Sequence, residues 1–299
     1  LIILMVLSRN VMTIQSLSDI NNSFDAGRFH VQRFTKNAGT AHAKVWADTS
    51  YASGQPPYDA RVGTAATFTP AIAQKNDAIY FPSIAAGMER YLVEAQVWTN
   101  QNTYNGPINM QFFDLLGYYP LIDGDSNDIQ DCTNDLTLPR YSDGVGVHMV
   151  MVNHIAPALQ NGLTVISYTN SDGVDKTVTV DIPNNGQNIV CSGCRNTTGA
   201  ASSTINIPLA AGDKGVLRIN SIQHTTAPGG LHCIYLVKFL GSMVLGDNLV
   251  TAEKSFITGK GFAPIRVYDG AWINWFDSLA LGTTARTVAW FGNLTFVWG

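Results

Sequence analysis

Most of the chain is a succession of short alternating runs separated by turn residues, and this pattern limits the fold more than any other feature. The stretch Gly162–Pro183, "GLTVISYTNSDGVDKTVTVDIP", has two such runs on either side of a turn rich in Asn, Ser, Asp and Gly. From about Asp77 onward, ten or more runs follow one another without a long helical pattern between them. Parallel βαβ units are therefore excluded, which leaves an antiparallel sandwich or barrel. We predict an all-β fold, an antiparallel β-sandwich or jelly roll.

Turn residues and alternation place individual strands. The run "RYLVEAQVWT" predicts a strand with Tyr91, Val93, Ala95 and Val97 on one face. Within Gly162–Pro183 both faces of the first run carry apolar groups, which predicts cover on both sides. Asx-Gly and Pro-Gly pairs mark the turns between runs. These pairs are Asn105-Gly106, Asp123-Gly124, Asp172-Gly173, Pro228-Gly229-Gly230 and Asp269-Gly270.

One short helix is expected near the start of the chain. The segment Thr13–Phe24 places Ile14, Leu17 and Ile20 at helical spacing, with Asn22 as a stop.

Residues 25–75 are rich in Ala, Gly, Thr and Pro and show little apolar periodicity. Because the Pro56-Pro57 pair favours an extended chain, we interpret this stretch as an arm that runs over a surface, such as that of another subunit. The segment 1–11 is either an artefact of the reading frame, with Met12 as the ordinary start, or a genuine apolar arm. We predict an extended N-terminal arm over 1–75 with one short helix.

Two β-sandwich regions are expected to follow the arm, over residues 76–183 and 184–299. They would form two jelly-roll-like halves with a break near Asn184–Asn188. The alternative is one continuous domain.

The charge content constrains the surface. Only 13% of the 299 residues are charged, whereas 45% are apolar. The usual charged share is about 25%. Either neighbouring subunits cover much of the surface, or Thr, Ser and Asn make up a large β surface, and both can hold together. The net charge of −4 provides no basic footprint, so we expect no direct nucleic-acid binding.

The four cysteines do not predict a disulfide framework in a chain of this length. Cys191 and Cys194 form "CSGC", which has the spacing of a redox motif or of half a zinc knuckle, but no helix pattern follows and there is no second pair. Structural thiols are the favoured interpretation, followed by a local disulfide and then by zinc.

Asp123–Asp131, "DGDSNDIQD", begins like a calcium loop. Asp128 and Asn134 then occupy the positions where the EF-hand pattern requires Gly and Glu. An acidic turn is the favoured interpretation, with a calcium site of another kind as the alternative.

Catalytic and cofactor motifs are missing from the sequence. No GxSxG, HExxH, P-loop or Rossmann pattern is present. We therefore expect no catalytic residue, no cofactor, no metal ligand and no enzymatic activity.

The aromatic residues near the end of the chain are the strongest candidate feature for binding. Trp272, Trp275, Trp290 and Trp298 predict either a strand core, which is favoured, or a sugar-stacking surface or subunit interface.

Several phrases carry a family resemblance: "RYLVEAQVWTN", "LLGYYPLIDGDSND" with "LTLPRYSDGVGV", "GLTVISYTNSDGV" and "GNLTFVWG". Over Met88–Gly299 the chain resembles virion proteins of tailed bacteriophages. The resemblance implies a structural component of the phage particle, with no catalytic residues to carry over.

Within a phage particle, we expect a head capsid, cement or decoration subunit. Its partners would be copies of itself, as a trimer or larger assembly, and other virion proteins, without a membrane. The alternatives are a tail or fibre protein that binds host glycans through the C-terminal aromatics, and a glycan hydrolase on a β scaffold.

Overall fold

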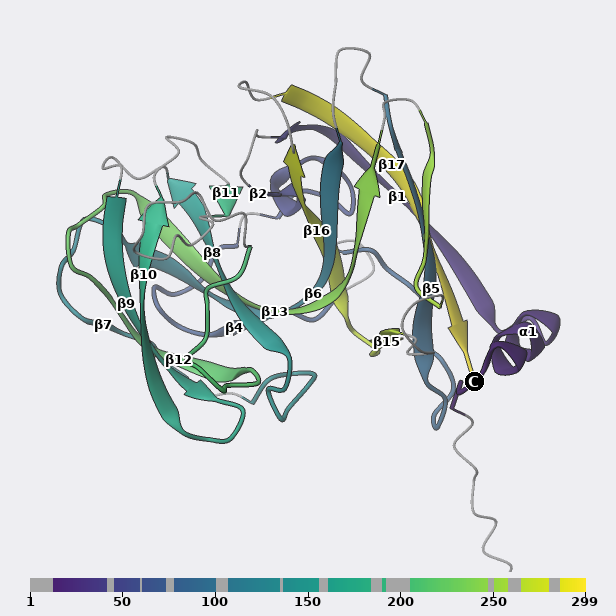
Figure 1. Ribbon diagram of the computed structural model, residues 1–299, viewed down its shortest axis with the longest axis horizontal. Coiled ribbons are helices and arrows are strands. Elements are labelled where there is room, and N and C mark those ends of the chain that lie inside the picture. The colour runs from purple at the N-terminus through teal and green to yellow at the C-terminus, as the bar shows by residue number, and fades with distance from the viewer. Residues whose placement is uncertain are drawn as a thin grey trace, which may run out of the picture.

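The computed structural model confirms an all-β fold with one α-helix among the residues it describes (Figure 1). These residues are 13–41, 46–59, 61–73, 78–100, 107–134, 137–155, 161–183, 190–191, 205–246, 250–257, 265–279 and 286–299. Their strands form three antiparallel sheets, consistent with a β-sandwich.

The first sheet has six strands and lies on the right of Figure 1. Its order is β14-β5-β17-β1-β3, and β15 also pairs with β5. The strands are β1 (Phe29–Ala41), β3 (Gly54–Gln55), β5 (Arg90–Thr99), β14 (Ala252–Ser255), β15 (Ile265–Val267) and β17 (Arg286–Trp298).

The central sheet has seven strands in the order β13-β8-β11-β2-β16-β6-β4, and β13 also pairs with β6. Because β13 and β6 are not neighbours in this order but still pair with each other, the sheet must be curled. The strands are β2 (Trp46–Asp48), β4 (Thr69–Pro70), β6 (Ile108–Asp123), β8 (Val147–Ile155), β11 (Val190–Cys191), β13 (Leu231–Leu245) and β16 (Trp272–Leu279); the 3-10 turn η1 (Thr49–Tyr51) follows β2.

The third sheet has four strands in the order β10-β9-β12-β7 and lies on the left of Figure 1. The strands are β7 (Gln130–Asp131), β9 (Asn161–Asn170), β10 (Asp175–Pro183) and β12 (Val216–His224).

Two long strands, β6 and β13, join the two lobes of the molecule. Phe112 of β6 packs in the core against the six-stranded sheet, while Leu116, four residues later, packs in the core against the four-stranded sheet. On β13, Leu240 likewise packs in the core against the six-stranded sheet, and Leu236 packs in the core against the four-stranded sheet. A third core, which includes Phe113, fills the inside of the curled central sheet. The central sheet is thus shared by two sandwiches.

Helix α1 (Leu17–Asp25) confirms the expected helix. The side chain of Ser16 caps it by accepting a hydrogen bond from the Asp19 amide. Ile20 is buried against one end of the six-stranded sheet, but Leu17 is 57% exposed, so only part of the predicted apolar stripe faces the protein. The helix also continues beyond the predicted stop at Asn22 to Asp25.

Strand β1 was not among the strands expected from the sequence. It lies between β17 and β3 and pairs with β17 from Phe29 to Ala41. Its Phe34 side chain is fully buried in the core. Polar and small residues surround Phe34 in the sequence, so alternation is weak, and pairing with β17 supplies the order that the local pattern lacks. An assembly role for residues 1–75 remains a prediction.

The predicted boundary at residue 184 also remains a prediction. Each outer sheet draws strands from both sides of it, since β9 and β12 pair in one sheet and β5 and β17 in the other.

Strand β5 is confirmed, but its predicted face is wrong. Ala95 and Val97 point into the core between the sheets, whereas Tyr91 and Val93 point to the opposite face, beneath α1. The register with β17 shifts at this point. Thr295 pairs with Glu94, but Phe296 pairs with Leu92, so the pairing passes over Val93. A bulge of one residue reverses the faces on either side of it.

The hairpin over Gly162–Pro183 forms as β9 and β10, joined by a turn. Ile166 and Tyr168 are buried, but Leu163 on the other face is 38% exposed. One face is therefore open in the single chain, and cover on both sides remains a prediction. Within the region of alternating runs after Asp77, the described stretches 78–83 and 205–209 contain no strand.

Candidate functional site

The outer face of the six-stranded sheet is the candidate site. Helix α1 covers one end of it, and no other described element is layered over the rest (Figure 1). Residues directly opposite each other across neighbouring strands point to the same side. The pairings therefore place these side chains on the outer face: Val31, Arg33 and Thr35 of β1, Phe291, Asn293 and Thr295 of β17, Glu94, Gln96 and Trp98 of β5, and Glu253 and Ser255 of β14.

An aromatic pair lies at one end of this face. The rings of Trp98 and Phe291 stack with centroids 6.0 Å apart and planes 13° apart, and both side chains are partly exposed. Toward the other end, Val31 is 48% exposed, and Phe29 on the same strand is 43% exposed. Apolar groups left partly open on a sheet face are typical of a contact surface.

A pair of carboxyl groups lies on the β5–β14 side. The Glu253 side chain hydrogen-bonds to Glu94, and this bond, together with the negative charge of Glu94, raises the pKa of Glu253. Thr295 Oγ1 also donates to Glu94 Oε2 at 3.2 Å.

Opposite charges lie at the two ends of one row across the face. The pairings order this row as Arg33, Asn293, Gln96 and Glu253, one residue from each of four strands. Arg33 and Glu253 are both exposed. Three interstrand spacings separate their backbones, about 14 Å, so the row is positive at one end and acidic at the other.

Two of the tryptophans singled out in the sequence occupy opposite faces of β16. Trp272 is 2% exposed, and its ring packs against the Arg61 guanidinium carbon at 4.0 Å from the ring centroid. Trp275 is fully buried against Phe34, with ring centroids 4.7 Å apart. These two rings belong to the core of the single chain.

The other two tryptophans lie on β17. Trp290 is fully buried and meets Trp275 edge to face at 6.5 Å. Trp298 is partly exposed, and its amide donates to the Arg28 carbonyl at 3.2 Å. A glycan cannot stack on the three buried rings, whereas an interface role for the four residues remains a prediction.

A group of polar side chains is buried inside the curl of the central sheet. Arg61 is 1% exposed and pairs with Asp59. Tyr235 donates to Asp48 Oδ2 at 2.7 Å, and Asp48 also accepts the Ser50 amide at 2.8 Å. Tyr235 and Ser50 thus satisfy Asp48, whereas Nε and Nη2 of Arg61 are buried without a hydrogen-bond partner in the described part of the chain.

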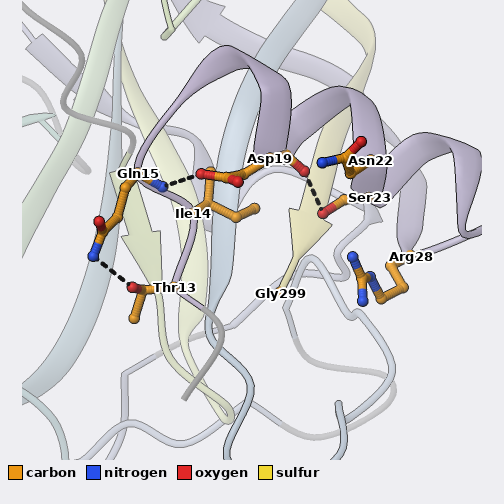
Figure 2. Close-up of a pocket in the computed structure, with 8 residues that line it drawn as sticks. All are labelled: Thr13, Ile14, Gln15, Asp19, Asn22, Ser23, Arg28 and Gly299. Carbon is orange, nitrogen blue, oxygen red and sulfur yellow. Dashed lines mark hydrogen bonds between the residues drawn. The ribbon is translucent and has the colours of Figure 1, made fainter. Parts of the chain in front are cut away.

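A shallow pocket of about 320 Å³ lies beside α1 (Figure 2). Its polar groups serve the helix end: Asp19 Oδ2 accepts the Gln15 amide at 2.9 Å, and Ser23 Oγ donates to the Asp19 carbonyl at 2.8 Å. The Gln15 side chain donates to Thr13 Oγ1 at 2.9 Å. Because these contacts cap and brace the helix, the pocket is a consequence of how α1 docks.

A larger cavity, of about 530 Å³, lies on the β13 side near the meeting of the lobes. Lys238 Nζ donates to the Val145 carbonyl at 3.0 Å and lies 5.2 Å from the ring centroid of Tyr141. Burial lowers the pKa of Lys238. The ring of Tyr141 meets Tyr268 edge to face at 4.8 Å.

The acidic stretch Asp123–Asp131 forms a closed turn. Gln130 accepts the Asp123 amide and donates to its carbonyl, both at 2.8 Å. Within the described residues, no cluster of three or more His, Cys, Asp or Glu side chains could hold a metal ion. Cys132 and Cys233 are buried free thiols. The Cys191 side chain and Cys194 lie outside the described part.

None of the helices in the described part of the chain has both the length and the apolar character needed to cross a membrane.

Comparisons with known proteins identify no relative by sequence. No protein-family model matches the chain, and no curated protein matches it. Among solved structures, similarity is found to particles derived from infectious bursal virus (10% identity, TM-score 0.18, 90% of this chain and 77% of that one) and to infectious bursal disease virus Gt strain (11%, 0.18, 90% and 80%). The VP2 subviral particle of infectious bursal disease virus gives 10% identity and a TM-score of 0.17 over 90% and 80% of the chains. Chains with TM-scores this low do not share an overall fold, so no functional argument rests on them.

The sequence did not single out the outer face, because its members are far apart along the chain. Glu94 and Glu253 are two of only three glutamates in the protein. That scarcity was the one available signal that they have a particular role, but only the sheet order brings them together.

Proposed function

We propose that this protein is a non-enzymatic structural subunit of a virus particle that acts by associating with copies of itself. More specifically, we propose that the particle is a bacteriophage and that the protein is a head capsid, cement or decoration subunit, as the resemblance over Met88–Gly299 implies.

The single observation that carries the proposal is the outer face of the six-stranded sheet. It combines partly exposed apolar groups, an aromatic stack and charges of both signs on one sheet face. Interfaces between subunits share this mixture of aromatic and polar groups. The low charge content of the whole chain, 13%, fits a protein whose surface is partly covered in an assembly.

Assembly through such a face would use many small contacts. The four strands that carry it span only about 14 Å from first to last, so one contact buries a limited area. When each subunit makes several such contacts, the assembly is stabilised by avidity, because the later contacts form within an existing complex.

Sedimentation velocity of the purified full chain, from micromolar to about 100 µM, tests the proposal. We expect association that rises with concentration to species larger than the monomer. A chain that remains monomeric over the whole range would contradict the proposal. The same measurement on a chain without residues 1–12 would show whether the segment before the described part contributes, while leaving α1 and β1 in place.

A further inference from the structure

We propose that two copies of this chain pack outer face to outer face about a two-fold axis parallel to the strands, between β17 and β5. The proposal rests on the self-association proposed above and names the surface that would mediate it. Its occupant is a second copy of this chain.

The charge pattern points to a second copy. In the row Arg33, Asn293, Gln96 and Glu253, the positive end and the acidic end are equally far from the line between β17 and β5. A two-fold rotation about that line reverses the row. Arg33 of one copy then lies over Glu253 of the other, and the reverse pair forms at the opposite end. An isologous contact requires this kind of self-complementarity.

The neighbouring aromatic row matches under the same rotation. Phe291 of one copy comes to lie over Trp98 of the other, which extends the stack already present within each chain. Sheets that pack face to face keep their strands within about 30° of each other, and this arrangement meets that condition. One operation therefore brings together the aromatic side chains and the opposite charges.

An unrelated partner would not require this symmetry. A basic partner would be attracted to Glu94 and Glu253 but repelled by Arg33. An acidic partner would be attracted to Arg33 but repelled by the two glutamates. The arrangement of both signs in one row favours a surface that carries the same row in the opposite direction.

Charge reversal tests the arrangement. The variants are Arg33→Glu, Glu253→Arg and the double variant, and the matched control is Asp172→Arg in the exposed hairpin turn of the four-stranded sheet. All three positions are exposed, so the fold should be retained, and circular dichroism with a thermal melt verifies this.

Association is measured by sedimentation velocity at low salt. Each two-fold contact contains two charge pairs, so we expect each single reversal to weaken association by about tenfold. The double variant should recover most of the loss, and the control should match the unmodified chain. Single reversals that match the control, or a double variant no better than the weaker single, would overturn the two-fold contact while self-association stands. An unmodified chain that does not associate would instead contradict the proposed function itself.

Discussion

Asp114 and Arg140 form a buried two-point ion pair between the two lobes. Arg140 Nη2 donates to Asp114 Oδ1 at 2.7 Å, and Nε donates to Oδ2 at 2.9 Å. The Trp272 amide also donates to Oδ1, at 2.8 Å. Both side chains are at least 90% buried, and Asp114 lies on β6 between its Phe112 and Leu116 core contacts. The pair therefore holds the shared sheet where one sandwich passes into the other.

Removing one partner of this pair should be strongly destabilising. Asp114→Asn leaves the Arg140 guanidinium buried without a counter-charge, which should lower the free energy of unfolding by about 3–5 kcal/mol. Urea unfolding followed by circular dichroism measures the change. Asp172→Asn, in an exposed turn, serves as the control and should change stability by less than about 0.5 kcal/mol. Equal stability of the two variants would contradict a central role for the pair.

Close packing on β17 gives a second prediction. A Cβ added at Gly292 would lie 2.4 Å from Phe34 Cζ and 2.5 Å from the Gln96 carbonyl oxygen. Gly292→Ala should therefore cost about 1–3 kcal/mol of stability by overpacking the core. Asn293→Ala, on the outer face one residue later, is the control and should have little effect. A Gly292→Ala protein as stable as the control would show that β1 and β17 do not pack as described.

Two buried histidines should make the fold sensitive to acid. Burial lowers the pKa of His224 to about 4 and that of His232 to about 3, while Thr164 and Asn153 hydrogen-bond their Nδ1 atoms. Below the unfolded value of about 6.5, the unfolded chain binds protons that the folded chain does not. Their contribution is therefore complete above pH 6.5 and is lost as the pH falls toward 4. His224 alone should account for about 3 kcal/mol of this loss.

Unfolding free energies between pH 7 and pH 4 measure this dependence. The slope of the unfolding free energy against pH counts the protons taken up on unfolding. His224→Gln should reduce this number by about one, whatever its effect on stability at pH 7. An unchanged slope in this variant would contradict a neutral buried His224.

The carboxyl pair should make self-association depend on pH. In the single chain, the hydrogen bond to Glu94 and the negative charge of Glu94 raise the pKa of Glu253, whereas Arg33 of a second copy would favour the charged form of Glu253. The associated state then binds fewer protons, so association should strengthen as the pH rises through the raised pKa. Glu94→Gln removes the charge that raises the pKa, and it should move the midpoint to lower pH. Sedimentation between pH 4 and 7.5 tests this, and an unmoved midpoint in Glu94→Gln would exclude the pair as its source.

The sequence predicted the strands well where alternation was strong. Strand β5 and the hairpin of β9 and β10 were located from local pattern and turn residues alone. The bulge in β5 was missed, because it is set by pairing with β17 and leaves no local trace. Strand β1 was missed for a similar reason, since its order comes from a partner strand near the other end of the chain.

The candidate site was harder to predict than the strands. Clustered aromatics directed attention to Trp272, Trp275 and Trp290, which the structure buries. The partly exposed stack instead joins Trp98 to Phe291. Composition alone does not distinguish a core ring from a surface ring, because that depends on which face of a strand the sheet leaves open.

Zero-length cross-linking tests the two-fold contact most directly. In an Arg33→Lys chain, a carbodiimide can join the new amine to the Glu253 carboxyl only if the two groups touch. Within one chain their backbones are about 14 Å apart, across two intervening strands. With equal amounts of ¹⁴N- and ¹⁵N-labelled chains, we predict a cross-linked peptide pair of mixed label that joins residue 33 to Glu253. An associated sample that yields no such pair, or only pairs within one chain, would contradict the account.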